Sequence, residues 1–130
     1  MAKFTLIEQP APGDEIPDPT TNPQWHTGDQ WLIVERILVD GSGQRGTFVT
    51  VGTVLQVSAN NDPLIAFHAT NRITRTGPGH PGGDISTQGV FRFSDFNNPV
   101  VIAIVGGTGE FSKARGTVTL DNGQFTFDVS

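Results

Sequence analysis

Several features are scarce in this sequence, and each shortage excludes a class of protein. There is no cysteine among the 130 residues, which excludes a disulfide framework, a thiol nucleophile and a thiolate metal site. Positive charge is also scarce, with 8 Lys and Arg against 13 Asp and Glu. This acidic balance argues against nucleic acid and anionic membranes as partners. No apolar run approaches the roughly 20 residues of a membrane helix.

Signals for targeting, metals and cofactors are equally sparse. The first eight residues lack the long apolar stretch of a secretory signal, so the expected location is the cytoplasm. The three histidines, His26, His68 and His80, do not have the spacing of metal ligands, so no metal site is expected. The glycine cluster at 106–109 has no helix after it and therefore does not predict a phosphate loop. We expect no cofactor.

Glycine is abundant, with 16 residues, and Val, Ile, Thr and Phe accompany it, a mixture typical of a turn-rich β protein. Turns rich in Gly, Asn, Asp and Pro separate strand-like segments, and no helical period of useful length is present. The expected strands are 3–9, 31–39, 46–58, 64–76, 84–93, 100–105, 114–120 and 124–129. Short strands joined by tight turns imply antiparallel pairing, and eight strands suffice to close a barrel. The sequence therefore predicts an all-β single domain, 1–130, folded as an eight-stranded antiparallel β-barrel.

Residues 10–29 contain five prolines and interrupt this pattern between the first two strands. Proline donates no backbone hydrogen bond, so this segment is not a central strand. It is either an ordered arm or lid over one end of the barrel, or a flexible leader. Trp25 and Trp31 favour the ordered arm, because exposed tryptophan is uncommon.

The segment 84–120 carries three linked motifs: Ser-Thr-Gln-Gly at 86–89, Val-Gly-Gly-Thr-Gly-Glu-Phe at 105–111 and Ala-Arg-Gly at 114–116. They resemble the allene oxide cyclase family, where a Ser-x-Gln-Gly strand precedes a Thr-Gly-Gly-x-Gly-x-Phe turn. They are equally similar to the dirigent proteins, whose hallmark is Val-Gly-Gly-Thr-Gly-x-Phe followed by Ala-Arg-Gly. The resemblance implies a calycin-like barrel and, as in bacterial relatives that close rings in polyketide pathways, a small cyclase. It also implies a homo-oligomer, a trimer or a dimer.

Glu35 is the first candidate for chemistry. Side chains alternate between the faces of a strand, so Trp31, Ile33, Glu35 and Ile37 share one largely apolar face. If that face points inward, burial raises the pKa of the carboxyl, which then acts as a general acid or a hydrogen-bond anchor. If the other face points inward, Glu35 lies in solvent. A buried ion pair is the structural alternative.

The strand 64–76 offers two further candidates on opposite faces. The face with Phe67, Asn71 and Ile73 is the more apolar and is expected inside, where Asn71 would bind a substrate carbonyl. His68, on the other face, is the rival as a proton shuttle. On 84–93 the face with Phe91 is expected to be buried. The predicted substrate-binding residues are Trp31, Ile33, Ile37, Phe48, Thr50, Phe67, Ile73 and Phe91.

Two functions follow from a barrel with these residues. The first is a cofactor-free cyclase or isomerase that holds an apolar biosynthetic intermediate in one conformation and directs stereoselective ring closure. The second is a non-catalytic binding protein, including a dirigent-like role that steers a reaction started by another enzyme. A barrel completely filled by its own side chains is a third possibility.

Overall fold

The computed structural model describes residues 2–8, 15–16, 24–39, 45–74 and 82–130, and at 2, 8, 15–16, 31–39 and 45 it describes the main chain alone. The strands are β1 (Ala2–Glu8), β2 (Glu15–Ile16), β3 (Gln30–Val39), β4 (Arg45–Val57), β5 (Pro63–Thr74), β6 (Gly83–Arg92), β7 (Val100–Gly107), β8 (Gly116–Asp121) and β9 (Gln124–Val129). Two short 3-10 helices, η1 (Phe93–Asn97) and η2 (Gly109–Phe111), follow β6 and β7. The predicted all-β class is confirmed.

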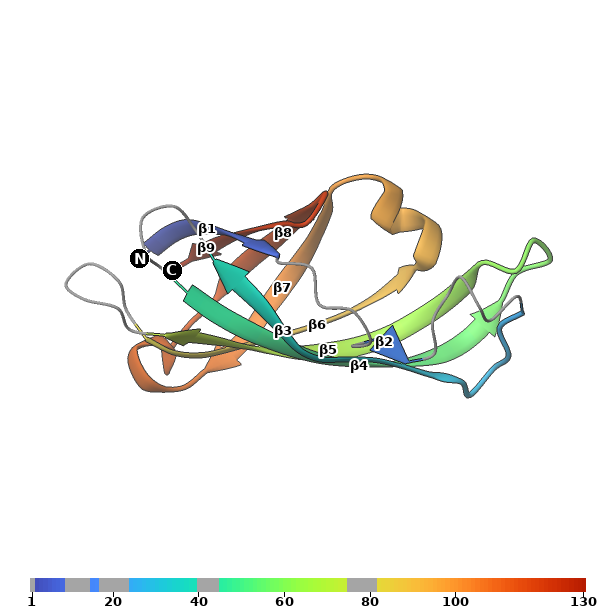
Figure 1. Ribbon diagram of the computed structural model, residues 1–130, viewed down its shortest axis with the longest axis horizontal. Helices are drawn as coiled ribbons and strands as arrows, with labels where there is room; N and C mark the ends of the chain where they lie inside the picture. Colours follow the sequence, from blue (N-terminus) through green and yellow to red (C-terminus); the bar gives the residue numbers. More distant parts are fainter. Residues whose placement is uncertain (1, 9–14, 17–23, 40–44, 75–81) are drawn as a thin grey trace.

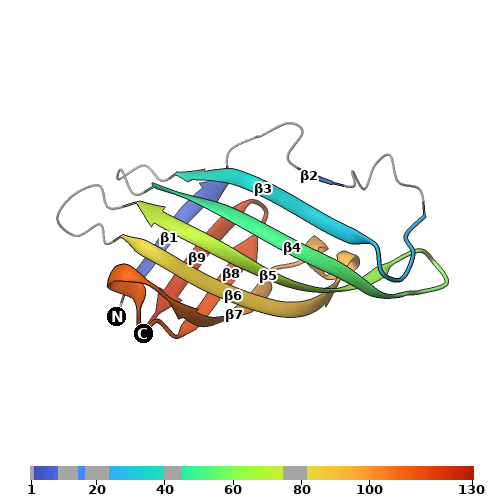
Figure 2. The same ribbon diagram turned by 90° about the horizontal axis from the view of Figure 1, so that it is seen from below.

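All strands belong to one antiparallel sheet in the order β1-β9-β8-β7-β6-β5-β4-β3-β2. The sheet curls, so that β1 also pairs with β3, through Ile7 opposite Val39 and Glu8 opposite Leu38. Strands β3–β7 form a broad layer, and β1, β9 and β8 cross behind it at an angle (Figure 2). The two chain ends lie side by side, since Ala2 pairs with Val129 (Figure 1).

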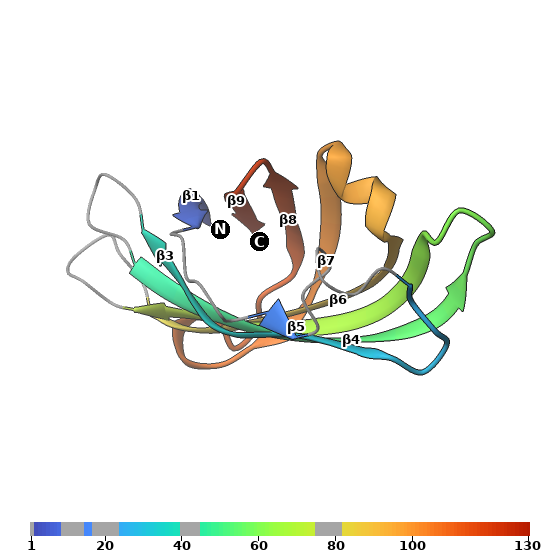
Figure 3. The same ribbon diagram turned by 45° about the vertical axis from the view of Figure 1, so that its right-hand side comes forward.

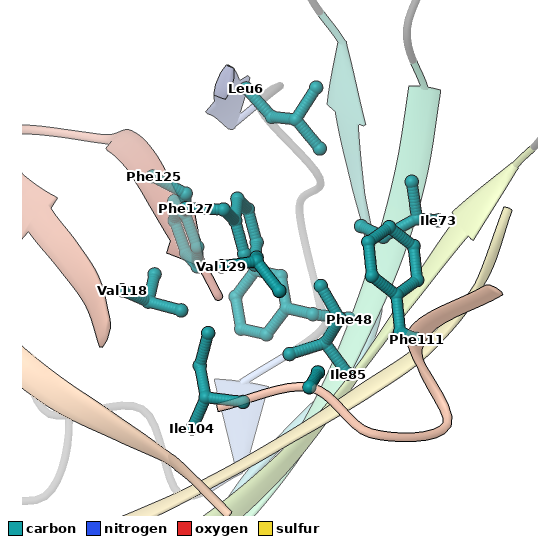
Figure 4. Packing of buried hydrophobic residues seen from close by; sticks show 11 residues of the cluster. Leu6, Phe48, Ile73, Ile85, Ile104, Phe111, Val118, Phe125, Phe127 and Val129 are labelled. Carbon is teal, nitrogen blue, oxygen red and sulfur yellow. The ribbon is translucent and has the colours of Figure 1, made fainter. Parts of the chain in front are cut away.

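Two apolar clusters line the inside of this curl. One lies where β1, β8 and β9 face the start of β4, the end of β5 and the start of β6, and it includes Phe48, Phe111, Phe125 and Phe127 (Figure 4). The other lies at the far end of β4–β7 and includes Trp25, Val54, Ile65, Phe67, Val100 and Ile102. We call them the Phe111 end and the Trp25 end.

The burial pattern confirms the predicted inward faces of two strands. On β5, Phe67, Asn71 and Ile73 are buried, while His68 between them is exposed. On β6, Ile85 and Thr87 are buried and Phe91 is partly buried. The alternation is clean here because one face of each strand meets the core and the other does not.

The segment 100–105 is wholly apolar, a pattern that predicts burial on both faces of the strand. This prediction is wrong, because β7 is buried on only one face. Val100, Ile102 and Ile104 point into the core, whereas Val101 is 58% exposed and Val105 is 42% exposed. The outward valines belong to an apolar outer face rather than to a second core layer.

The chain departs from the predicted strand at Phe93. We expected the strand to continue through Phe93, but β6 ends at Arg92 and η1 begins (Figure 3). The Arg92 main-chain N–H donates a 2.8 Å hydrogen bond to the Asp95 carboxylate. This capping bond satisfies a donor at the start of the turn and favours the helical conformation.

Of the predicted arm, the structure describes β2 and residues 24–29. β2 pairs with β3, with Glu15 opposite Ile33 and Ile16 opposite Leu32. Trp25 is buried, with 4% of its surface exposed. The remainder of the predicted arm lies outside the described residues.

Candidate functional site

Three polar side chains are buried on the inner face of β4, β5 and β6. Thr50 is 4% exposed, Asn71 2% and Thr87 4%. The strand register places Thr50 opposite Ala69, and Ala69 opposite Thr87, in a single row across three strands. Asn71 lies two residues from Ala69 on the same face of β5. We call these three residues the polar belt.

The polar belt lies where the two apolar clusters meet. Toward the Phe111 end, the next row contains Phe48 and Ile85, which flank Asn71 on either side. Toward the Trp25 end, the next row contains Phe67 between Gly52 and Gly89. The belt is therefore a polar zone within an apolar interior, and small residues border it on one side.

The hydrogen bonds of the belt are incomplete within the part of the chain that the structure describes. The Asn71 Nδ2 group donates to the Ile85 carbonyl at 3.2 Å, and the Thr50 hydroxyl donates to the His68 carbonyl at 3.0 Å. Among the described residues, the Asn71 Oδ1 atom and the Thr87 hydroxyl have no hydrogen-bond partner. A buried polar group without a partner costs about 1–3 kcal/mol. The belt can therefore offer an acceptor and a hydroxyl to a bound molecule.

The belt is also uncharged. Thr50, Asn71 and Thr87 are the only buried polar or charged side chains among those described. Neutral amide and hydroxyl groups orient a ligand by hydrogen bonding, and they do not transfer protons near neutral pH. No buried side chain among those described could therefore transfer a proton near neutral pH.

β3 forms the wall next to this belt, and its register is irregular there. Ile33 lies opposite Thr50 and Arg36 opposite Phe48, so β3 has one residue more than β4 between these pairs. Such a bulge interrupts strict alternation, and the rule that grouped Glu35 with Ile33 does not run through it. The side chains of Trp31, Ile33, Glu35 and Ile37 lie outside the described residues, and their site roles stay predictions.

The other predicted site residues separate into two groups. Phe48, Thr50, Phe67, Asn71 and Ile73 are buried on the inner face, and Phe91 is partly buried beside them. His68 is exposed on the outer face of β5, so the structure does not bring it to the belt. Sequence reasoning missed Thr87 as a site residue. Its only signal was its place on the Ile85 and Phe91 face, which does not reveal that its hydroxyl is unpaired.

His68 belongs instead to a shallow outer groove on β4–β7, with a volume of about 530 Å³. Its lining residues are Val51, Thr53, Ala66, Phe67, His68, Gln88, Gly89, Val90, Ala103 and Val105. Val49, Leu55 and Val101 lie on the same strands and are 43–58% exposed. We call this surface the apolar outer face.

The described residues offer neither a metal centre nor a helix suited to a membrane. They contain no group of three or more His, Asp or Glu residues placed to hold a metal ion. None of their helices has the length and apolar character needed to cross a membrane.

The fold and the interior together define a small all-β protein with a neutral polar belt enclosed by apolar side chains. Among solved structures, this chain is similar to pyocyanin demethylase, with a TM-score of 0.71. The match covers 99% of this chain and 100% of that one, at 20% sequence identity. The likeness is consistent with a small barrel fold and does not point to the allene oxide cyclase or dirigent family in particular. No protein-family model and no curated protein matches the sequence.

Proposed function

We propose that this protein binds an apolar small molecule in its interior, with the polar belt as the group that orients it. The observation that carries the proposal is the pair of buried polar atoms, Asn71 Oδ1 and the Thr87 hydroxyl, that lack a partner among the described residues. In a core made only for stability, apolar side chains of similar shape would avoid this cost. A ligand with one polar edge and an otherwise apolar surface matches such an interior.

The proposal includes a closed barrel of eight strands, β1 and β3–β9. It is supported by the pairing of β1 with β3, which joins the sheet over two residue pairs. A barrel of this size either is filled by side chains or holds one small ligand. The small residues beside the belt, Ala69, Gly52 and Gly89, favour the second arrangement.

As the activity, we propose a cofactor-free cyclisation or isomerisation of an apolar biosynthetic intermediate. Enclosure would hold a flexible substrate in one conformation and exclude water, while the belt polarises one oxygen of the substrate. Glu35 is the proposed general acid, since it lies on β3, which pairs with β4 beside the belt residue Thr50. The name of the structural neighbour, pyocyanin demethylase, describes an enzyme that modifies a small molecule, and this supports a site of the same general kind.

The alternative is a non-catalytic binding protein, including a dirigent-like one. The observation that favours it is the uncharged belt, because the described interior contains no titratable side chain. Binding without turnover needs only the shape and the hydrogen bonds that are present.

The test is a titration of the purified protein with pyocyanin as the probe, followed by mass spectrometry of the recovered probe. We expect binding that weakens when Thr87→Val removes the belt hydroxyl. Thr70→Val, the same change on the exposed face of β5, is the matched control and should bind like wild type. Equal affinities for all three proteins would contradict the interior site. A probe recovered with an altered mass would show turnover and would contradict the non-catalytic alternative.

We also propose that copies of this chain associate through the apolar outer face. No Asp, Glu, Lys or Arg is present among the residues that line the outer groove, although the chain carries a net charge of −5. Two copies can therefore meet there without apposing like charges, and exposed Val90, Val101 and Val105 would leave water. Sedimentation should show a dimer or trimer that Val101→Asp converts to a monomer. Ser112→Asp, outside this face, should leave the assembly intact, and a monomeric wild type would contradict the proposal.

A further inference from the structure

The two ends of the interior are closed by different means. At the Phe111 end, main-chain hydrogen bonds hold η2 in place: the Thr108 N–H donates to the Asp84 carbonyl at 2.9 Å, and the Glu110 N–H donates to the Gly82 carbonyl at 3.1 Å. A Cβ atom on Gly107 would lie 2.4 Å from two main-chain oxygens. Among the residues that the structure describes, the contacts that fix η2 at this end are between main-chain atoms.

At the Trp25 end, aromatic side chains form the closure. The rings of Trp25 and Phe93 meet edge to face, with centroids 5.3 Å apart. The ring of Phe96, also from η1, has its centroid 5.8 Å from that of Phe91 and 6.3 Å from that of Phe67. Two separate segments, residues 24–29 and η1, thus cover this end, and η1 is the coil between β6 and β7 in Figure 1.

One turn between β4 and β5 holds both covering segments. The Asn61 Oδ1 atom accepts a 2.8 Å hydrogen bond from the Trp25 main-chain N–H. The neighbouring Asp62 carboxylate accepts hydrogen bonds from the main-chain N–H and the hydroxyl of Ser94 in η1. The Arg92 guanidinium donates to the Asp62 carbonyl at 3.0 Å. These are side-chain contacts, which break at lower cost than a strand ladder.

The path from this end to the polar belt is short. Phe91 lies four residues beyond Thr87 on β6, which corresponds to about 13 Å along a strand. Between them is Gly89, and the Phe91 ring lies so close that a Cβ at this position would be 2.5 Å from it. If the Phe91 ring moved together with η1, the surface of Gly89 beside the belt would be uncovered.

We infer that the interior ligand reaches the polar belt through the Trp25 end, and that Asn61 and Asp62 form the latch that keeps this end closed. The inference rests on the proposed interior site. Asp62 holds η1 through its hydrogen bonds to Ser94, and Asn61 holds Trp25 through its hydrogen bond to the Trp25 N–H. Residues 24–29 stay attached to the sheet when the latch opens, because Gly28 and Asp29 exchange main-chain hydrogen bonds with Val54 at 2.8 Å.

The experiment measures opening and ligand exchange separately. Trp31→Phe leaves Trp25 as the sole tryptophan, since the chain has two, and this background is used only for acrylamide quenching of Trp25, which reports opening. Stopped-flow fluorescence with anilinonaphthalene sulfonate gives the association and dissociation rates of an apolar probe, and these rates are measured with Trp31 in place because it is a predicted substrate-binding residue. In both backgrounds, Asp62→Ala and Asn61→Ala release one segment each. Glu110→Ala is the control, because its carboxylate accepts a bond from the Gly82 N–H at the other end.

We expect Asp62→Ala to raise both probe rates about tenfold while the dissociation constant changes little, since two hydrogen bonds to a carboxylate hold the closed state. Asn61→Ala should increase the quenching of Trp25, and Glu110→Ala should change neither quantity. All measurements are made well below the thermal midpoint of each variant. Unchanged rates in Asp62→Ala, or an equal increase in Glu110→Ala, would overturn the access route. A wild type that binds no probe would contradict the interior site instead, and Trp25 quenching would still decide whether the latch exists.

Discussion

Replacing Thr87 by Val removes a buried hydroxyl and keeps the shape of the side chain. Thr87 is 4% exposed, and its hydroxyl has no partner among the described residues. Removing an unpaired buried hydroxyl should stabilise the empty protein by about 1–2 kcal/mol. For a chain of this length, that corresponds to a rise of roughly 3–8 °C in the melting temperature.

Thr50→Val is the comparison that makes this test sharp. Thr50 is equally buried, but its hydroxyl donates to the His68 carbonyl at 3.0 Å. Loss of this hydrogen bond should destabilise the protein by about 0.5–1.5 kcal/mol. The same chemical change on either side of Ala69 in one row should therefore change the stability with opposite signs.

The assay is thermal unfolding of both variants without ligand, followed by titration with pyocyanin. We expect Thr87→Val to be more stable and to bind the probe about three- to tenfold more weakly, the loss of one hydrogen bond. Destabilisation of Thr87→Val by more than about 1 kcal/mol would refute the argument, because it would mean that the hydroxyl already has a partner.

Three further predictions follow from the same structure. Asn71→Leu should leave the unfolding free energy within about 1 kcal/mol of wild type, because apolar burial offsets the lost hydrogen bond to the Ile85 carbonyl. The same variant should bind the probe more weakly. A large loss of stability with full affinity would make Asn71 purely structural. Gly107→Ala should cost about 3 kcal/mol or more in chemical denaturation, because its Cβ would meet main-chain oxygens at 2.4 Å, while Gly106→Ala, with no atom within 4 Å, should be neutral. If Glu35 is the general acid, Glu35→Gln should lower turnover about 10²- to 10⁴-fold in a product assay and leave substrate binding intact; full activity and full stability would mean that Glu35 faces solvent.

The alternation of polar and apolar residues was sufficient for β5 and β6. On both strands, one face packs against the core and the other does not, so Asn71 and Phe67 could be assigned inward from the sequence. The same rule was insufficient for β7, because both faces are apolar and only the curl of the sheet decides that Val101 lies outside. On β3, the bulge between Ile33 and Arg36 interrupts the alternation of inward and outward side chains, and a hydrophobic pattern does not reveal where a bulge occurs.

The latch residues could not be predicted from the sequence. From the sequence, Asn61 and Asp62 belong only to the turn between the expected strands 46–58 and 64–76, and the structure does place them in a turn between β4 and β5. Asn61 has φ 60°, a left-handed conformation that asparagine tolerates. Their contacts to Trp25 and Ser94 span more than 30 residues of sequence. Such pairings depend on how the two covering segments fold back over the sheet, which no local pattern encodes.

The most direct test of the interior site is methyl NMR of the protein during titration with pyocyanin. The methyl groups of Thr50, Thr87 and Ile104 lie in one row of the interior, whereas those of Val90 and Val105 line the outer groove. The proposed site predicts that the interior methyl resonances shift with the probe and saturate, while the outer ones stay unchanged. Shifts confined to Val90 and Val105, with the interior row unaffected, would contradict it.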